Sequence, residues 1–470
     1  MGKLKKESQL DIFKVLLSRL VNPSHELCIL ATEIEWTGLE KELEGYYSDT
    51  GRPSIPIRTM VGMLFLKNMF NQSDESVVAR WIENPYWQYF TGEQYFQNSQ
   101  PFDPSEFVHF RKRMGQAGME KIMSFTVKLH QGALTEKEVQ IDSTVQPKDI
   151  TFPTDAKLAK KIIDNCLKIS KVEETSLRQS YRREVKQLMK DQYNSKHAKR
   201  AKKGRKARRR LQTIAGRLIR ELRRELPEEM LNSIYASELE MYEQVLAQKK
   251  GDKNKIYSLH EPNTACIAKG KAHKQYEFGS KVTLIRGSKT GVILGALSVE
   301  GNPHDSKLLA PSLKQCKRIL TTVEGLMPTI AITDRGYRGV KEVAGVKILI
   351  PSPGKRNQSK YQKHKTRKRF RARAGIEPVI GHIKHDHRMI RNFIKGGLGD
   401  IVNAISASMG FNLKKRLNQI AFLPLFLINL IINSSLCDKT KQIPSDCALT
   451  YHIIILCNMY FVSLERTKFF

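Results

Sequence analysis

One short segment toward the C-terminal end spaces an aromatic ring, an acid and two cations so that a helix would carry all four on one stripe: Phe370, Arg373, Glu377 and Lys384. A carboxylate flanked by cations is a poor core face, but it can hold a metal ion and bind a phosphate. The alternative is an ordinary Arg–Glu pair on a solvated helix. Pro378 disfavours helix at Glu377, so we expect a kink or a helix start there.

Two further acids, Asp142 and Asp334, each stand where a short apolar run ends. The runs, 138–145 and 329–337, are rich in β-branched residues and bounded by turn or charged residues, which predicts buried strands. An acid at the end of a buried strand can project into a cleft, although a turn cap is the more common role of a single such residue. Together with Glu377, these acids suggest a three-carboxylate site for two divalent ions.

These motifs resemble the DDE transposases of bacterial insertion sequences, and most closely the division marked by a Tyr-Arg-Glu-Lys signature. The resemblance spans most of residues 10–415. It rests on Asp142, on the segment from Thr333 to Gly339, and on the segment from Phe370 to Lys384. Further matching segments are 52–56, 257–262, 270–274, 301–303 and 376–389. Two residues depart from the family pattern: Phe370 replaces the signature tyrosine, and Thr333 replaces a small apolar residue.

The resemblance implies an enzyme that binds the terminal inverted repeats of its own mobile element and then cuts and joins DNA. The catalytic residues and metal ligands would be Asp142, Asp334 and Glu377, holding two Mg²⁺ ions, with Mn²⁺ as a substitute. A homodimer would pair two double-stranded DNA ends and then join them to target DNA. The implied DNA contacts close to the acids are Arg335, Tyr337, Phe370, Arg373 and Lys384.

Two other functions stay open at this point. The chain could be a metal-dependent nuclease that uses the same acids without strand transfer. It could also be a catalytically inactive DNA-binding relic that represses transposition. Strand-transfer products distinguish the transposase from the nuclease, and Mg²⁺-dependent cleavage distinguishes both enzymes from the relic.

The charge of the chain favours a polyanionic partner. Its 470 residues carry a formal net charge of +33, with a sequence pI near 9.8. Nucleic acid is the expected partner, with an anionic membrane surface or an acidic protein as alternatives. Seven cysteines are scattered singly, and the N-terminus lacks a continuous apolar run. We therefore expect a cytoplasmic, nucleoid-associated protein without a disulfide framework, signal peptide or membrane attachment.

Two basic runs add to this expectation. The first includes Lys202, Lys203, Arg205, Arg208 and Arg209, and its one-sided charge favours contacts with the DNA backbone over a merely solvated face. The second extends from Lys355 to Arg371 and leads into the segment of Glu377. Histidines between 382 and 387 lack a recognised zinc spacing, so phosphate or structural contacts are preferred for them. His304 and Asp305 could begin a helix or form a secondary acidic position.

The element pattern predicts a mixed α/β protein with three parts. Residues 1–135 read as a helical DNA-binding domain, in which Ser73 caps a helix that carries Arg80. Its two central helices could form a helix-turn-helix or simply pack in a core. Residues 136–415 read as a ribonuclease H-like core with a mixed sheet, interrupted by a basic helical insertion at 151–250. The apolar tail 416–470 contains a run shorter than the ~20 residues of a membrane span, so we expect a helix packed on the core or a poorly ordered end.

Overall fold

The computed structural model describes residues 15–48, 50, 53–193, 195, 197–249, 251–268, 275–351 and 359–437, with side chains up to residue 422. The expected motif at 270–274, the start of the second basic run at 355–356 and the apolar stretch at 453–456 lie outside the described residues.

The N-terminal region is helical, as expected. Its elements are α1 (Leu17–Leu20), α2 (Glu26–Glu33), α3 (Trp36–Leu43), η1 (Glu44–Tyr46), α4 (Ile57–Met69), α5 (Asp74–Glu83), α6 (Pro85–Phe90), α7 (Glu106–Lys128) and α8 (Gln131–Leu134). The predicted cap is confirmed, because the Ser73 hydroxyl accepts a hydrogen bond from the Ser76 backbone N–H at 3.0 Å. Helix α4 is buried from Thr59 to Met69, whereas Arg80 on α5 is exposed. The α4–α5 pair therefore packs in a core, and DNA contact by Arg80 stays a prediction.

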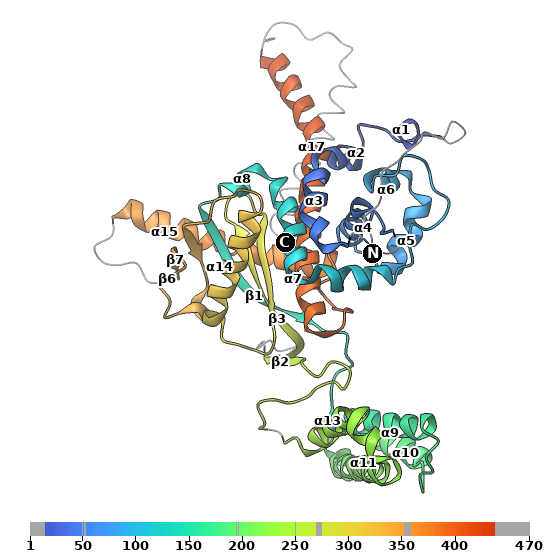
Figure 1. The fold of residues 1–470 in the computed structure, drawn as a ribbon. Coiled ribbons are helices and arrows are strands. Elements are labelled where there is room, and N and C mark those ends of the chain that lie inside the picture. The colour runs from blue at the N-terminus through green and yellow to red at the C-terminus, as the bar shows by residue number, and fades with distance from the viewer. Residues whose placement is uncertain are drawn as a thin grey trace.

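The central element is a mixed seven-stranded sheet (Figure 1). Its strands are β1 (Glu138–Pro147), β2 (Ala265–Ala268), β3 (Tyr276–Gly287), β4 (Ile293–Val299), β5 (Ile330–Ile332), β6 (Glu342–Val343) and β7 (Val346–Leu349). The order is β2-β3-β1-β5-β7-β6, with β4 also paired to β3. Strand β1 is antiparallel to β3 and parallel to β5. The predicted fold class, a ribonuclease H-like α/β core after a helical region, is confirmed.

Side-chain amides from two helices cover the outer edge of β4. Asn412 lies on α17 (Gly396–Cys437) and bonds both the N–H and the carbonyl of Ile293 at 2.9 Å. Gln315 lies on α14 (Asp305–Thr321) and bonds the Ala296 N–H at 2.9 Å and its carbonyl at 3.2 Å. An uncovered strand edge invites pairing with another chain, so these amides fix both helices against the sheet and close that edge.

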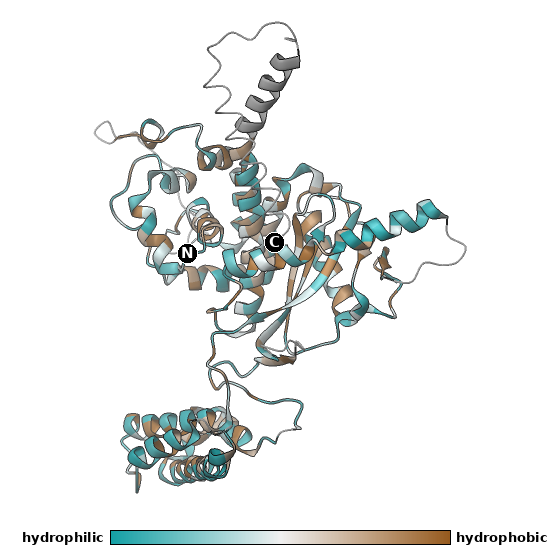
Figure 2. Ribbon diagram, turned by 180° about the vertical axis from the view of Figure 1, so that it is seen from behind, coloured by the Kyte–Doolittle hydropathy of each residue, from teal (hydrophilic) through white to brown (hydrophobic). Residues whose placement is uncertain are grey.

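The insertion forms a separate helical bundle joined to the sheet by two chain segments (Figure 1). Its helices are α9 (Asp155–Val172), α10 (Arg182–Gln192), α11 (Ala198–Glu225), α12 (Glu228–Ser233) and α13 (Ala236–Ala247). Leu211, Ile214 and Leu218 on α11 belong to a core distinct from that of the sheet. Figure 2 shows hydrophobic and hydrophilic residues alternating along the helices of the bundle, and hydrophobic ones such as Ile219 and Leu222 are buried. This pattern follows from the helical spacing of the apolar residues.

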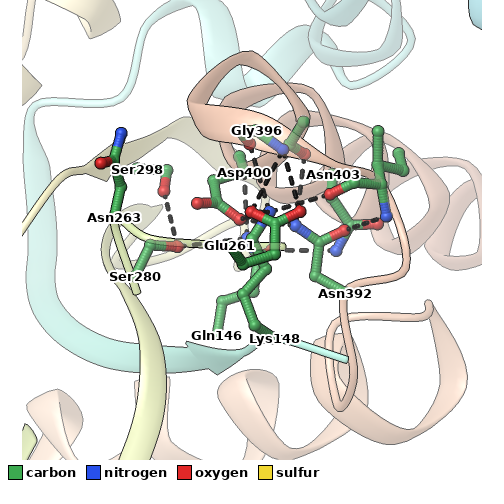
Figure 3. A network of polar contacts seen from close by, with 12 residues as sticks. Gln146, Lys148, Glu261, Asn263, Ser280, Ser298, Asn392, Gly396, Asp400 and Asn403 are labelled. Atoms are coloured by element: carbon green, nitrogen blue, oxygen red, sulfur yellow. Dashed lines mark hydrogen bonds and ion pairs between the residues drawn. The ribbon is translucent and has the colours of Figure 1, made fainter. Parts of the chain in front are cut away.

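A buried polar network holds both connections of the insertion to the core (Figure 3). The Lys148 ammonium, just before the insertion, contacts the Glu261 carboxylate at 3.3 Å and that of Asp400 at 2.9 Å. Glu261 follows the insertion and accepts the Gly396 N–H at 3.1 Å. Gln146 accepts a hydrogen bond from Asn403 on α17. Because the side chains of Gln146, Lys148, Glu261 and Asn403 are buried and satisfied within this network, they tie the end of β1 to the start of α17.

The C-terminal helices are α15 (Lys360–Arg373), α16 (Ile376–Asp386) and α17. Helix α17 runs through the boundary expected at residue 416, and Leu417 and Ile420 are buried. Arg416 contacts Glu33 on α2. This part of α17 therefore packs on the core. Among the helices searched within the described residues, none has the length and apolar character needed to cross a membrane.

Candidate active site

Asp142 and Asp334 come from neighbouring parallel strands. Gln140 on β1 pairs with Ile332 on β5. Each acid lies two residues further along its chain, so both are at the level where β5 ends. Asp334 lies just beyond β5, whereas Asp142 lies within β1, which continues to Pro147, so the expectation that a strand ends at Asp142 is wrong. Asp334 also caps the turn η2 (Arg335–Tyr337), because its Oδ1 accepts the Gly336 N–H at 2.9 Å. The sequence alternatives of turn cap and cleft acid are thus compatible at this position.

The segment of the third acid consists of two helices. Helix α15 ends at Arg373, and α16 begins at Ile376 with Glu377 in its first turn. The expected helix start near Glu377 is confirmed, and its cause is local: Pro378 lacks an N–H and fits only the first turn of a helix. The simple picture of one continuous helical stripe from Phe370 to Lys384 is therefore wrong.

Arg373 brings the two parts of the candidate site together across this helix break. Its Nη1 lies 3.6 Å from Oδ2 of Asp142, and its Nη2 lies 3.7 Å from Oε1 of Glu377. Side-chain exposure differs sharply between the acids, at 17% for Asp142 and 65% for Glu377. Glu377 is thus the acid with most freedom to turn.

The acids are close enough to affect one another's ionisation. Burial raises the pKa of Asp142 to about 6, and the negative charges of Asp334 and Glu377 add to the rise. Arg373 and a hydrogen bond of 2.8 Å from the Ser143 N–H act in the opposite direction. A buried carboxylate that two other acids oppose and one arginine offsets is a good position for a cation.

The donor chemistry at this site fits Mg²⁺, a hard cation that prefers carboxylate oxygens and keeps several waters. As the side chains stand, no group of three or more His, Cys, Asp or Glu residues in the described ranges is arranged to hold a metal. The Arg373 guanidinium contacts two of the three acids, and Glu377 is mostly exposed. A metal site here therefore requires Glu377 to turn toward Asp142 and Asp334.

A fourth acid, Asp305, lies beside this site. The predicted helix start is confirmed, because α14 begins at Asp305 and the His304 ring accepts the Ser306 N–H. Oδ1 of Asp305 accepts a hydrogen bond from Ser143 Oγ and contacts Nζ of Lys281, both at 2.7 Å. The sequence offered the pair His304-Asp305 as its only signal, since Ser143 and Lys281 reach Asp305 through the packing of β1, β3 and α14.

The residues near the acids that are expected to contact DNA differ in their solvent exposure. Arg335 is exposed, and Phe370 and Lys384 are half-buried. Tyr337 is fully buried, so its side chain is not accessible in this structure, and contact with DNA stays a prediction. Burial is the main cause that raises the pKa of its hydroxyl, followed by Asp305 and Asp142. Tyr337 therefore belongs to the packing beneath the acids.

The basic face of α11 points outward. Lys202, Lys203, Arg205, Arg208 and Arg209 are all exposed. Lys203 contacts Asp191 at 2.8 Å and Arg208 contacts Asp155 at 3.3 Å. Within the part of the chain that the structure describes, no ion pair is found for Lys202, Arg205 or Arg209. The charge of these five cations is thus partly neutralised by acids of other helices, and three of the five stay available.

The other polar residues of this region make structural contacts. Arg369 pairs with Glu138 on β1. The His382 ring lies 2.7 Å from the Asp386 carboxylate on the next turn of α16. His387 is buried and contacts the Asn68 carbonyl at 2.9 Å. Structural contact, one of the two preferred roles for these histidines, is confirmed for His382 and His387.

The mixed sheet and the position of the acids place this protein in the class of α/β enzymes with a ribonuclease H-like core. A transposase domain model (DUF772) matches residues 15–113, and a transposase DDE domain model matches residues 249–403, which include Asp334 and Glu377. An uncharacterized protein, ORF8 in the nfe locus of Rhizobium meliloti, is 39% identical over 181 residues, which cover 37% of this chain and 87% of that protein. No solved structure matches the chain significantly. The chain belongs to the DDE transposases of insertion sequences, whose substrates are DNA.

Proposed function

We propose that this transposase binds the terminal inverted repeats of its insertion sequence, cleaves DNA there in a divalent-metal-dependent reaction and joins the cut ends to target DNA. The observation that carries the proposal is the convergence of the acids from β1 and from the end of β5 with the α15–α16 junction, where Arg373 contacts both Asp142 and Glu377. These residues come from three separate segments of the chain, so local structure alone does not explain their proximity.

Asp142, Asp334 and Glu377 are the residues that would hold Mg²⁺, as two ions. Divalent ions supply Lewis-acid stabilisation of the charge that develops on the attacked phosphodiester. The contribution of the chain is to keep one carboxylate rigid within β1, a second in the turn after β5 and a third on a helix start. Ser143 adds to this rigidity, since its N–H holds one oxygen of Asp142 and its hydroxyl is held by Asp305.

Arg373 is suited to bind the phosphate that flanks the cut. Its contacts with the two acids, 3.6 and 3.7 Å, are longer than hydrogen bonds, so its donors are open to a phosphate. Lys384 on α16 and the exposed Arg335 would add charge on either side, and the half-buried ring of Phe370 would pack beside a displaced nucleotide. None of these cations can ligate Mg²⁺, so their role is to orient DNA.

The exposed face of α11 would hold the DNA backbone outside the catalytic core. Lys202, Arg205 and Arg209 support this role most directly, because they lack ion-pair partners among the described residues. Backbone contacts of this kind contribute affinity without sequence preference. Pairing of two ends would require a homodimer, whose second copy would bring a second set of these cations.

The experiment that tests the proposal uses purified full-length protein, a duplex carrying the inverted repeat that flanks the gene, and a target plasmid. With Mg²⁺ we expect cut ends and joined products, and with a chelator we expect binding alone. Cleavage without joining would favour the nuclease alternative. Binding without cleavage in Mg²⁺ or Mn²⁺ would favour the inactive relic.

A further inference from the structure

Gln140 occupies an unusual position for an amide side chain. It lies on β1 two residues before Asp142, so both side chains are on the same side of the strand. It is fully buried. Its Nε2 donates to the Ala372 carbonyl at 2.7 Å, and its Oε1 accepts from Nη1 of Arg286 at 2.6 Å. A buried amide with both ends bonded to distant segments acts as a fixed spacer between them.

The carbonyl that Gln140 binds lies at the junction of α15 and α16. Ala372 is next to Arg373, and its carbonyl also accepts the Gly375 N–H at 3.0 Å. The last carbonyls of a helix lack partners within the helix, so a side chain that binds one fixes where the helix ends. Through Ala372, the Gln140 amide fixes the segment that presents Arg373 and Glu377.

Few other contacts fix helix α15 against the sheet. All of its side chains are described, and none is buried. Figure 1 shows α15 extending away from the sheet. Its polar contacts with β1 are the Arg369–Glu138 pair, the Ala372–Gln140 hydrogen bond and the longer contact of Arg373 with Asp142. Since apolar burial contributes little here, the position of Arg373 depends on these polar contacts.

Arg286 holds the other end of the Gln140 amide. It is the direct cross-strand partner of Gln140 on β3. A side chain added at Gly375 would place its Cβ 3.1 Å from the Ala372 carbonyl oxygen and 3.3 Å from Nη1 of Arg286. These distances are tight for a Cβ, so glycine at position 375 leaves room for the junction to sit against β1.

We propose that Gln140 and Arg286 are positioning residues of the transposase: they clamp the α15–α16 junction onto β1 and so set how Arg373 and Glu377 face Asp142. The proposal rests on the proposed function for its effect on catalysis, but the clamp itself is a statement about structure. A displacement of about 1 Å between catalytic groups can lower a rate about 100-fold.

The decisive variant is Gln140→Glu, which keeps the size of the side chain and an acceptor for Arg286. It replaces the donor that binds Ala372 with a carboxylate oxygen, which repels that carbonyl. The chain offers a matched control in Gln146→Glu. Gln146 is a buried glutamine on the same strand, but its partners are Asn403 and the Asp400 carbonyl (Figure 3) rather than α15.

Two measurements separate the clamp from its catalytic role. The first is the rate of trypsin cleavage within α15, which needs no transposase activity. The second is single-turnover DNA cleavage over a Mg²⁺ series. We expect Gln140→Glu to be cut in α15 at least about 10-fold faster than the control, to cleave DNA about 10- to 100-fold more slowly, and to need more Mg²⁺ for half-maximal rate. End binding should match that of the control.

Equal trypsin rates in Gln140→Glu and Gln146→Glu would overturn the clamp. Faster proteolysis with an unchanged rate and Mg²⁺ requirement would overturn the positioning role. If Gln140→Glu does not fold, Gly375→Ala is the substitute, because its added Cβ presses on the same two groups at a helical backbone position. Wild type that never cleaves DNA would contradict the proposed function, while the trypsin comparison would still decide the clamp.

Discussion

Arg373 at the end of α15 contacts Asp142 in the middle of β1, with 3.6 Å between Nη1 and Oδ2. An arginine beside a buried acid offsets the repulsion from neighbouring carboxylates and leaves other donors for a ligand. The same side chain can therefore orient the acids before DNA binds and grip a phosphate afterwards.

Arg373→Lys should impair cleavage although the charge is kept, because a lysine cannot reproduce the planar fork. Lys384→Arg should be better tolerated, since a point charge suffices there. We would measure single-turnover cleavage of an end-containing duplex across a Mg²⁺ series, with Glu377→Asp for comparison. Only Glu377→Asp should shift the Mg²⁺ requirement strongly. Normal cutting by Arg373→Lys, or a defect that disappears at high Mg²⁺, would leave Arg373 with an orienting role alone.

Asp142→Asn should stabilise the protein at pH 7 when no divalent ion is added. The folded protein raises the pKa of Asp142 from 3.8 to about 6, so the folded state loses stability as pH rises between these values. Above pH 6 the ionised acid costs about 2–3 kcal/mol, which the amide relieves. The measurement is thermal unfolding at pH 4 and pH 7 in a chelator.

Added Mg²⁺ should reverse this order, because a ligand of the folded state stabilises it by mass action. The melting temperature of the wild type should rise, and that of Asp142→Asn should rise less. Asp164→Asn, at an exposed aspartate of the insertion, is the control and should behave as wild type. Lower stability of Asp142→Asn than of wild type at pH 7 would show that the charge of Asp142 is well compensated.

Neutralising Lys202, Arg205 and Arg209 together should flatten the salt dependence of DNA binding by about three units of slope. Sequence preference should stay nearly the same, since backbone contacts do not read bases. The control replaces Lys41, Lys314 and Lys317, which are exposed, lie outside the insertion and remove the same charge. If both triple variants change the slope equally, the effect is one of net charge and α11 is only a solvated face.

The parts of the site that depend on local sequence were predictable. Asp142 and Asp334 follow β-branched runs, and Pro378 sets a helix start that periodicity alone would miss. Residues whose role depends on contacts with segments far away in the sequence were not predictable. Tyr337 is in the same motif as Asp334, yet the packing of its turn buries it.

Gln140 is the converse case, a residue that supports the site but was not predicted. A glutamine among apolar strand residues gives no local signal, and its role appears only when α15 and β3 lie against β1. The ion pairs of α11 with α9 and α10 are also invisible in sequence, because their acids are far away along the chain. Local patterns therefore predicted the acids, and tertiary contacts determine what supports them.

The most direct test of the account is a single-turnover assay of cleavage and joining on a preformed complex with the terminal repeat, using Asp142→Asn, Asp334→Asn and Glu377→Gln. Each substitution removes one charged oxygen ligand and keeps the size of the side chain. We predict that each variant binds the end as wild type does but loses both reactions by at least about 10³-fold, about 4 kcal/mol of barrier. Activity near that of wild type in any one variant would show that this acid is not part of the catalytic set.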